Sequence, residues 1–562
     1  MPVTTFPVIF DPSLHSFKNA IVKKSISAIR ILLYPAFFLL FFKESEGQKL
    51  NTYSILDFGA KANGQVVNTK AINGAIQTCH DQGGGTVVVP AGTYITGTIR
   101  LLSNINLHLE AGSVLLGSKD TLDYLALNSP LFNEGYSHYG LIYAKNAINI
   151  SITGEGQING NGTWFMHDLK KLNDFFTLDK SVIRQGSNYM KAGTISEDGP
   201  LSYDYRPGML FTFDHCENIH LTDIFIKDAP EWTMRIGDCD NVAIRGITIN
   251  NNPLIPNNDG IHCTVSRNIR ISDCNIFTGD DAIIVSGISN QPPGIIDTIG
   301  NKTGIAENVT VTNCILSSRS SCIRVGYGEH PIRNLLFNNL VMYASNRGIG
   351  IFSRNGSDIE NVNFSNIMIN THIPTGNWWG KGEPIHISAI KDRNNGNAGK
   401  IKNIRFSNIT ATTETGIIIY GSPESIIEDV RLDKITLTIN PGKNAESYGG
   451  NFDLQPAYPA NLNLYKHDIP GLYAQYVKGL TVSGFELSWG KGLQPYFTNG
   501  IEINHFKDIW IEGMRGDPAF SQKGLAGISL SDGSGVRLQN NENAGHKAIS
   551  VIKQRDVYLL SQ

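Results

Sequence analysis

Three aspartates in two short motifs stand near the middle of the chain. Asp259 lies in Pro-Asn-Asn-Asp-Gly at 256–260, and Asp280 and Asp281 lie in Thr-Gly-Asp-Asp-Ala at 278–282. The pair follows the first aspartate by 21 and 22 residues, about one coil of the repeat that surrounds them. Residues one coil apart stack above one another, so the spacing predicts a cluster of three carboxylates. Like charges raise each other's pKa, and such a cluster is costly unless it has a chemical use.

Grouped carboxylic acids of this kind suit the hydrolysis of a glycosidic bond. In the inverting reaction one protonated acid gives its proton to the leaving oxygen, and a carboxylate base activates water on the opposite side of the sugar. An acid held among other carboxylates has a raised pKa and stays protonated near neutral pH. Consecutive strand residues point to opposite faces, so Asp280 and Asp281 can share a cleft only if the chain bends at Gly279. The alternative is a calcium site or a turn-forming acidic cluster.

A short pattern, asparagine followed by apolar, any and apolar residues, recurs through the chain. It begins at Asn218, Asn241, Asn268, Asn308, Asn334, Asn361 and Asn403. Most steps are 23 to 27 residues long, and two steps of 40 and 42 residues indicate coils that carry a loop insertion. This period, with short alternating strands and no helical pattern, predicts a β-solenoid, and the frame of leucine-rich repeats is missing. The expected fold is all-β, a right-handed parallel β-helix.

One β-helix catalytic domain is expected over residues 48–562. A short helix at about 69–81 is predicted to cap the first coil, because a bare coil end exposes the core and the strand edges. Loop insertions are expected where the periodicity breaks, near 166–206, 287–304, 371–400 and 440–475. Such loops can close a groove into a pocket, which favours removal of terminal sugars over cleavage within a chain.

The first 47 residues are predicted to be a signal for export. Lys23, Lys24 and Arg30 precede twelve apolar residues at 31–42. This run is too short to span a bilayer comfortably but suits the apolar core of a signal peptide. The alternative is a buried apolar strand. The protein is expected to be exported, periplasmic or secreted, with no stable membrane span.

Charge and cysteine content argue against several classes of protein. With 47 Lys and Arg against 50 Asp and Glu, nothing indicates the concentrated basic surface that a nucleic-acid partner requires. The seven cysteines form no Cys-x-x-Cys pair, and their odd number argues against a disulfide framework or a zinc site. No cofactor or metal is expected, and the protein is expected to be a monomer.

Several motifs occur together in one order. They are Asp-Phe-Gly-Ala at 57–60, a glycine-rich run at 154–162 followed by Trp164, Arg206-Pro207, Asn-Asp-Gly at 258–260 and Gly-Asp-Asp at 279–281. This set resembles family 28 of the glycoside hydrolases, the polygalacturonases and their relatives, with Asn258 in place of the threonine of the family's Asn-Thr-Asp motif. The resemblance implies a hydrolase of pectin, with Asp280 as proton donor and with Asp259 and Asp281 orienting the water.

Two segments differ from the family pattern. The family's Gly-His-Gly segment aligns with 320–326, where Ser321 replaces the histidine. The Arg-Ile-Lys segment, which in polygalacturonases grips a galacturonate carboxylate, aligns with Gly350-Ile351-Phe352, so both basic residues are gone. The expected enzyme is therefore an exo-acting galacturonidase or rhamnogalacturonan-type hydrolase, and its partner is a plant cell-wall pectic polysaccharide or oligosaccharide.

Counting back nine or ten residues from each repeat asparagine predicts which side chains flank the first aspartate along one groove. These positions are Trp232, Arg324 and Phe352. The aromatic faces suit stacking on sugar rings, and Arg324 is a candidate for the missing positive charge. Arg354 and Arg235 are alternative sources of that charge. Each residue is also compatible with an ordinary position on an exposed face.

Four further residues are predicted to contact substrate. Asn258 lies within the first motif, and His262 follows three residues after the aspartate. Trp378 and Trp379 stand in a glycine-rich loop that is expected to form a wall of the cleft. The alternative for the histidine is a packed or solvated side chain, and for the tryptophans a structural anchor.

Two rival functions use the same fold. A β-helix pectate lyase would need calcium and an arginine base in place of grouped acids. A carbohydrate-binding or adhesin β-helix would need no acids. The three aspartates favour the hydrolase over both.

Overall fold

The computed structural model describes residues 51–127, 138–167, 201, 203–288, 304–374, 378–391, 397–445, 449–454, 464–465 and 467–559. The predicted signal for export, 1–47, lies outside these residues. Residues Asn51–Gln562 form one compact unit. Among the described residues, no helix has the length and apolar character needed to cross a membrane.

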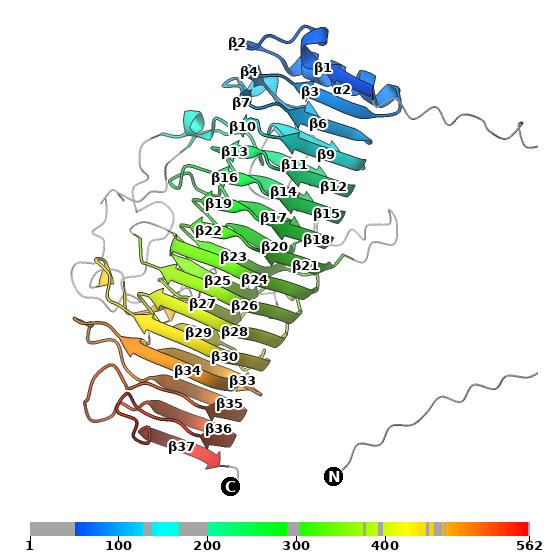
Figure 1. Ribbon diagram of the computed structural model, residues 1–562. Coiled ribbons are helices and arrows are strands. Elements are labelled where there is room, and N and C mark those ends of the chain that lie inside the picture. Colours follow the sequence, from blue (N-terminus) through cyan, green and yellow to red (C-terminus); the bar gives the residue numbers. More distant parts are fainter. Residues whose placement is uncertain are drawn as a thin grey trace, which may run out of the picture. The chain divides into compact units, whose positions relative to one another are not determined.

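Parallel strands stack coil upon coil in three columns, called the first, second and third sheets below, which the long strands join into one 35-stranded arrangement (Figure 1). Each short coil contributes one strand to each sheet, so β17 (Ile261–Thr264) pairs with β14 (Met234–Gly237) before it and β20 (Ile283–Gly287) after it. Alternate residues of these strands, such as Ile261 and Cys263, enter one continuous apolar core. Their neighbours, such as His262, point to the opposite face of the strand. The predicted right-handed parallel β-helix is confirmed.

The first sheet carries the candidate site. Its other strands are β5 (Ile99–Arg100), β8 (Ile142–Lys145), β11 (Phe211–Asp214), β23 (Ser321–Gly328), β25 (Arg347–Ser353), β27 (Ile385–Ala389), β29 (Ile417–Tyr420) and β33 (Leu472–Lys478), followed by the longer β35 (Ile501–Glu512), β36 (Ile528–Gln539) and β37 (Val551–Leu559).

The second and third sheets complete each coil. The second holds β1 (Asn51–Ser54), β3 (Gly85–Val89), β6 (Ile105–Leu109), β9 (Ile148–Gly154), β12 (Glu217–Thr222), β15 (Asp240–Arg245), β18 (Arg267–Ser272), β21 (Ala306–Thr312) and β34 (Thr481–Trp489). The third holds β2 (Asn63–Val67), β4 (Gly92–Thr96), β7 (Ser113–Gly117), β10 (Gln157–Asn159), β13 (Phe225–Lys227), β16 (Thr248–Asn250), β19 (Asn275–Thr278) and β22 (Ile315–Ser318). Four long strands continue the second sheet and turn the corner to the third, β24 (Ile332–Ser345), β26 (Ile359–Thr371), β28 (Ile401–Thr413) and β30 (Ile427–Ile439), and β34 follows β30 around the same corner.

The repeat asparagines explain the period of the sequence. Each adopts left-handed backbone geometry, with φ between 54° and 59° from Asn218 to Asn403. Asparagine tolerates this region better than most residues. Their side chains also bond from coil to coil, as where Asn241 Nδ2 donates to Asn218 Oδ1 at 2.7 Å. One residue type therefore both turns the chain and ties adjacent coils together.

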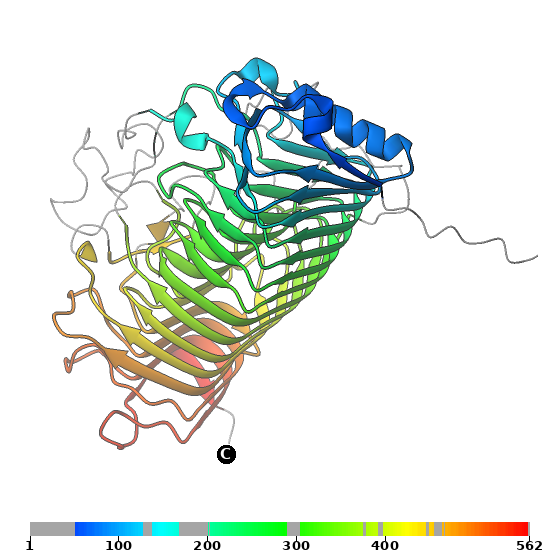
Figure 2. The same cartoon turned by 45° about the horizontal axis from the view of Figure 1, so that its top comes forward.

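The predicted capping helix is present as α2 (Thr69–Asp81), and Figure 2 shows it at the first coils. It buries Ile72, Ala75, Ile76 and Cys79 against the core. Three short 3₁₀ turns accompany the early coils, η1 (Ile55–Phe58), η2 (Thr121–Asp123) and η3 (Gly162–Phe165). The first coil is thereby covered, as the exposed edge of a solenoid requires.

Two of the four predicted insertions fall mostly outside the described residues, those near 166–206 and 287–304. The predicted insertion at 371–400 is not one loop, because β27 lies inside it and continues the first sheet. The strand has only five residues between two irregular segments, too short for its alternation to stand out. The interval 440–475 likewise holds the antiparallel pair β31 (Phe452–Asp453) and β32 (Leu464–Tyr465) and the start of β33.

Candidate active site

Five side chains occupy the same position on successive coils, at the start of strands in the first sheet. They are Trp232, Asp259, Asp281, Ser321 and Arg347. Backbone bonds fix this register, since the N–H groups that follow Trp232 and Asp259 donate to the carbonyls of Asp259 and Asp281, both at 2.8 Å. Strand pairing continues the column from Ser321 to Arg347. One-coil spacing therefore places Asp259 and Asp281 side by side, as the sequence predicts.

A bend at Gly279 brings Asp280 in beside Asp281. Gly279 N donates to the side-chain oxygen of Asn258 at 2.6 Å, and a Cβ at this position would lie 2.6 Å from the same oxygen. Only glycine fits so close an approach. The Asp280 carbonyl accepts from the Ser318 hydroxyl at 2.7 Å, and Asp281 N donates to Asp280 Oδ1 at 2.9 Å. The bend is thus held on both sides.

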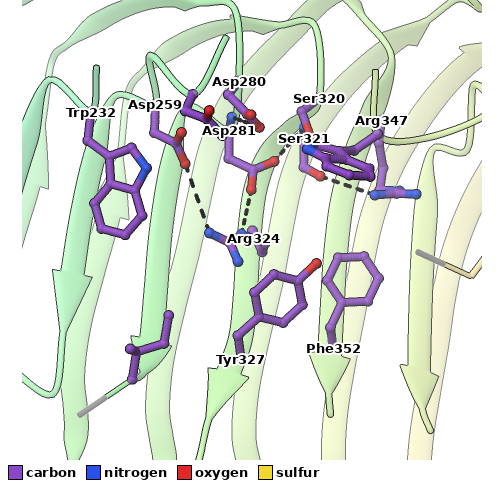
Figure 3. Close-up of a pocket in the computed structure, with 13 residues that line it drawn as sticks. Trp232, Asp259, Asp280, Asp281, Ser320, Ser321, Arg324, Tyr327, Arg347 and Phe352 are labelled. Carbon is purple, nitrogen blue, oxygen red and sulfur yellow. Dashed lines mark hydrogen bonds and ion pairs between the residues drawn. The ribbon is translucent and has the colours of Figure 1, made fainter. Parts of the chain in front are cut away.

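The three carboxylates open into a cavity of about 210 Å³ (Figure 3). Its other lining residues are Trp232, Asn257, Ile288, Ser320, Ser321, Arg324, Tyr327, Arg347, Phe352 and Trp379. Figure 3 shows Trp232 at one end and Arg347 at the other, with the acids between them. The aspartates form the first of two charged groups in this wall.

The first group, the acid cluster, consists of Asp259, Asp280, Asp281 and Arg324. One carboxylate oxygen of each aspartate lies within 4.8 Å of the others. Arg324 reaches into them, with Nε in an ion pair with Asp281 Oδ2 and with Nη2 3.9 Å from Asp259 Oδ2. Burial, and then the Asp281 charge, raise the pKa of Asp280 to about 7, against the lowering effect of Arg324. Burial and both neighbouring carboxylates also raise the pKa of Asp259 well above its usual range.

The second group, the arginine cluster, consists of Arg347, Glu383 and Asp453. Arg347 Nε lies 3.5 Å from Glu383 Oε2, and Nη2 lies 3.6 Å from Asp453 Oδ2. Asp453 also accepts from Gly380 N at 2.7 Å, beside the wall residue Trp379. Burial raises the pKa of Asp453 to about 6, although Arg347 opposes this shift. The cluster holds one cation at the pocket wall and fixes the loop beside it.

The sequence comparison assigns the family. Residues 79–449 match the family model described as glycosyl hydrolases family 28, which is well over half of the chain. The chain belongs to glycosyl hydrolase family 28. The predicted membership is therefore confirmed, and the acid cluster lies within the matched residues.

Relatives of this family 28 protein include plant and bacterial proteins. A probable polygalacturonase of Vitis vinifera is 29% identical over 42% of this chain and 44% of its own length. An exo-poly-alpha-D-galacturonosidase of Dickeya chrysanthemi is 28% identical over 52% of this chain and 58% of its own length. The chain thus spans about half the length of these curated relatives. The structure of a family 28 exopolygalacturonase of Yersinia enterocolitica shares the fold, with a TM-score of 0.55, 21% identity, and coverage of 82% of this chain and 78% of the other.

The two altered family segments lie in the wall of the pocket. Ser321, at the position of the family's histidine, is 3.5 Å from Arg347 Nη1 and donates its backbone N–H to Asp281 Oδ1 at 2.8 Å. Phe352, at the position of the lysine, is fully buried and stacks with Tyr327. Arg347 therefore brings a positive charge to the column from a position between the two family segments.

The predicted groove residues line the pocket, but in a different register. Trp232 shares the column of Asp259, whereas Arg324 lies three residues beyond Ser321 of that column, and Phe352 five beyond Arg347. Counting back fails because β23 and β25 are longer than β17, and because the pairing of β20 with β23 shifts after Val285. Long side chains bring both residues back to the cavity. Strand length, which the asparagine spacing does not reveal, decides this.

Three predicted contacts lie outside the cavity. Asn258 is buried, and its amide bonds to Gly279 N and to the Asn252 carbonyl, so the predicted substrate contact is wrong. His262 is buried behind the pocket and does not line it. Trp378 is 9% exposed and does not line the cavity, whereas its neighbour Trp379 does.

The alternative sources of charge are also away from the cavity. Arg235 is fully buried, with Nη1 3.8 Å from Asp214 Oδ1. Arg354 is buried, with Nη2 3.4 Å from the Ser388 hydroxyl. Neither residue lines the pocket.

Arg347 and Tyr327 are among the lining residues that were not predicted as site residues from the sequence. Arg347 follows Ser321 by one coil, so one-coil stacking predicts that it lies beside the position of the replaced histidine. Tyr327 lies under Arg324, with the guanidinium carbon 4.2 Å from its ring centroid. No sequence pattern marks Tyr327.

Proposed function

We propose that this family 28 protein is an exported glycoside hydrolase that removes sugars from the ends of pectin-type chains, as a galacturonidase or rhamnogalacturonan-type enzyme. The observation that carries the proposal is the acid cluster in a small pocket, with the pKa of Asp280 raised to about 7. A carboxylic acid in this state is protonated near neutral pH, as a proton donor must be. The name of the Dickeya relative, an exo-poly-alpha-D-galacturonosidase, supports the substrate class.

Asp280 is the proposed acid, and Asp259 and Asp281 are the proposed holders of the attacking water. Asp280 donates its proton to the leaving glycosidic oxygen while the water attacks the sugar from the other side and loses a proton to a carboxylate. Arg324 compensates the negative charge of the cluster through its ion pair with Asp281. Tyr327 and Trp232 supply aromatic faces for the sugar ring.

The spacing of the acids is unusual for inversion. Inverting enzymes generally separate their two carboxyl groups by about 6.5–9.5 Å and retaining enzymes by about 5–5.5 Å. Here oxygens from all three aspartates lie within 4.8 Å. We nevertheless propose inversion, because two carboxylates beyond the acid can hold a water between them.

The size of the pocket supports action at chain ends. A cavity of about 210 Å³ is smaller than the roughly 300–1,000 Å³ of pockets for drug-sized ligands. Such a space suits one sugar ring better than several consecutive rings. End-wise release of single sugars is therefore proposed over cleavage within a chain.

Incubation with a panel of pectic oligosaccharides tests this function. The expected product is a single sugar released from one chain end, and proton NMR of the first product is expected to show an inverted anomer. An unsaturated sugar that requires calcium would indicate the lyase, and binding of the panel without cleavage would indicate an adhesin. A retained anomer would overturn the proposed stereochemistry but leave the hydrolase.

A further inference from the structure

His262 lies on β17 behind the pocket. It contacts a carboxyl group and the guanidinium group of the acid cluster. Its ring is fully buried and stacks on Trp232, with 3.6 Å between ring centroids and 19° between planes. Nε2 lies 3.1 Å from Asp259 Oδ2 and 3.1 Å from Arg324 Nη2. Nδ1 has no hydrogen-bond partner among the described residues. One ring nitrogen therefore faces an acid and a cation at once.

The chemistry of these groups restricts where the protons lie. An arginine nitrogen only donates, so the 3.1 Å contact between Nε2 and Arg324 Nη2 is a hydrogen bond only when Nε2 accepts and carries no proton of its own. The neutral ring then holds its proton on Nδ1. With Nε2 unprotonated, an ionised Asp259 oxygen 3.1 Å away would be a second acceptor, so this arrangement requires a proton on Asp259 that shares the single Nε2 lone pair with the Arg324 N–H. That proton belongs to the carboxylic acid.

With the exception of Arg324 acting on Asp259, the surroundings of this pair favour the uncharged form of both side chains. Burial, Arg324 on β23 and Arg235 on β14 lower the pKa of His262 well below its usual value, so the ring is neutral. Burial, Asp280, Asp281 and Glu231 raise the pKa of Asp259, whereas Arg324 lowers it. The balance favours an uncharged Asp259 next to an uncharged ring.

We propose that His262 is a positioning residue whose Nε2 orients Arg324 and holds the proton on Asp259 in the resting pocket. Asp259 becomes a base only after this proton leaves to solvent, and its carboxylate can then accept a proton from the attacking water. The inference deepens the proposed hydrolase, on which its kinetic consequence rests. The arrangement of protons itself does not depend on which substrate is cleaved.

The first test locates the ring proton without any substrate. The full chain is labelled with ¹⁵N-histidine, and long-range ¹H–¹⁵N spectra are recorded near pH 7, with the His262 signals assigned from their loss in His262→Gln. The expected pattern is that of a neutral ring with its proton on Nδ1. A proton on Nε2, or a doubly protonated ring, would overturn the proposal.

The second test follows the pH dependence of kcat/KM in His262→Gln. A glutamine amide can turn its oxygen to Arg324 and its NH₂ to Asp259, which stabilises the ionised carboxylate and lowers the pKa of Asp259. The ascending limb of the profile is expected to move to lower pH by about one unit. A limb that coincides with that of the wild type would contradict the proposal.

His386→Gln is the matched control. His386 is equally buried, lies in the same sheet column on β27 and contacts Phe352 in place of an acid. The ascending limb of the kcat/KM profile of His386→Gln is expected to stay at the pH of the wild type. A shift equal to that of His262→Gln would count against the proposal. Thermal unfolding of both variants verifies that they are folded. A wild type that cleaves no pectic substrate overturns the proposed function, while the ring-proton spectra still decide the role of His262.

Discussion

At one end of the pocket three carboxylates share a single arginine, and at the other end a single arginine is shared by two carboxylates. In the acid cluster Arg324 is paired with Asp281 and leaves the burial of Asp280 and Asp259 only partly compensated. In the arginine cluster Arg347 has Glu383 and Asp453 within 3.6 Å. The first arrangement keeps protons on carboxylic acids, which suits proton donation to a leaving group. The second holds a wall and a loop in place, which suits recognition.

Removal of the shared cation is expected to have the largest effect. Arg324→Met leaves buried carboxylates without their counter-charge, which costs about 3–5 kcal/mol in the free energy of unfolding at neutral pH. The activity is expected to fall by about 100-fold or more, because the acids lose their orientation. Denaturant unfolding and kcat/KM measure the two effects. The control is Arg333→Met, which breaks a half-exposed pair with Glu307 and is expected to cost about 0–1 kcal/mol. Equal losses of stability in both variants would contradict the distinction between the buried acid cluster and a half-exposed ion pair.

Stability should depend on pH through Asp280. Its pKa is about 7 in the folded protein and 3.8 ordinarily, so the folded state binds this proton more tightly than the unfolded state. The resulting stability is fully present below about pH 3.8 and is lost as the pH rises through about 7. Asp280→Asn removes this dependence and is expected to be about 1–3 kcal/mol more stable than the wild type near pH 8. Near pH 4 the two proteins should be nearly equal. A variant that is less stable at both pH values would refute a protonated Asp280.

The arginine cluster should respond in binding more than in chemistry. Asp453→Asn keeps the shape of the side chain but removes one of the two charges on Arg347, at an expected cost of about 1–3 kcal/mol in unfolding free energy. KM is expected to rise several-fold while kcat changes little, because the wall that includes Trp379 loosens and the acid cluster is untouched. Steady-state kinetics on the released-sugar assay separates the two constants. A fall in kcat at unchanged KM would contradict the assignment of chemistry to the acid cluster and of binding to the arginine cluster.

Ser321 is expected to matter least. It stands at the position of the family's histidine, but its hydroxyl is 3.5 Å from Arg347 Nη1, and its backbone N–H, which any residue supplies, bonds to Asp281. Ser321→Ala is therefore expected to change kcat/KM by less than about threefold and stability by within about 0.5 kcal/mol. A large loss of activity would mean that the hydroxyl has taken over a catalytic role.

The difference between the acid cluster and the arginine cluster also explains which part of the pocket can be predicted from the sequence. The acid cluster is built from short motifs one coil apart, so the repeat alone predicts that Asp259, Asp280 and Asp281 lie together. Arg347 and Asp453 are 106 residues apart and meet only because a loop folds back onto the first sheet. The lengths of β23 and of the loops decide such contacts, and the repeat pattern carries no information about either. The fold can be predicted from the asparagine period, and the arginine cluster cannot.

The role of Asp280 as the proton donor is tested most directly by varying the leaving group. Wild type and Asp280→Asn are compared on an oligosaccharide and on an aryl glycoside of the same sugar, whose phenolate leaves without protonation. The rate of Asp280→Asn is expected to fall by about 100- to 10,000-fold on the oligosaccharide and by far less on the aryl glycoside. An equal fall on both substrates, or a rate within a few-fold of the wild type on the oligosaccharide, would contradict the assignment of Asp280 as the acid.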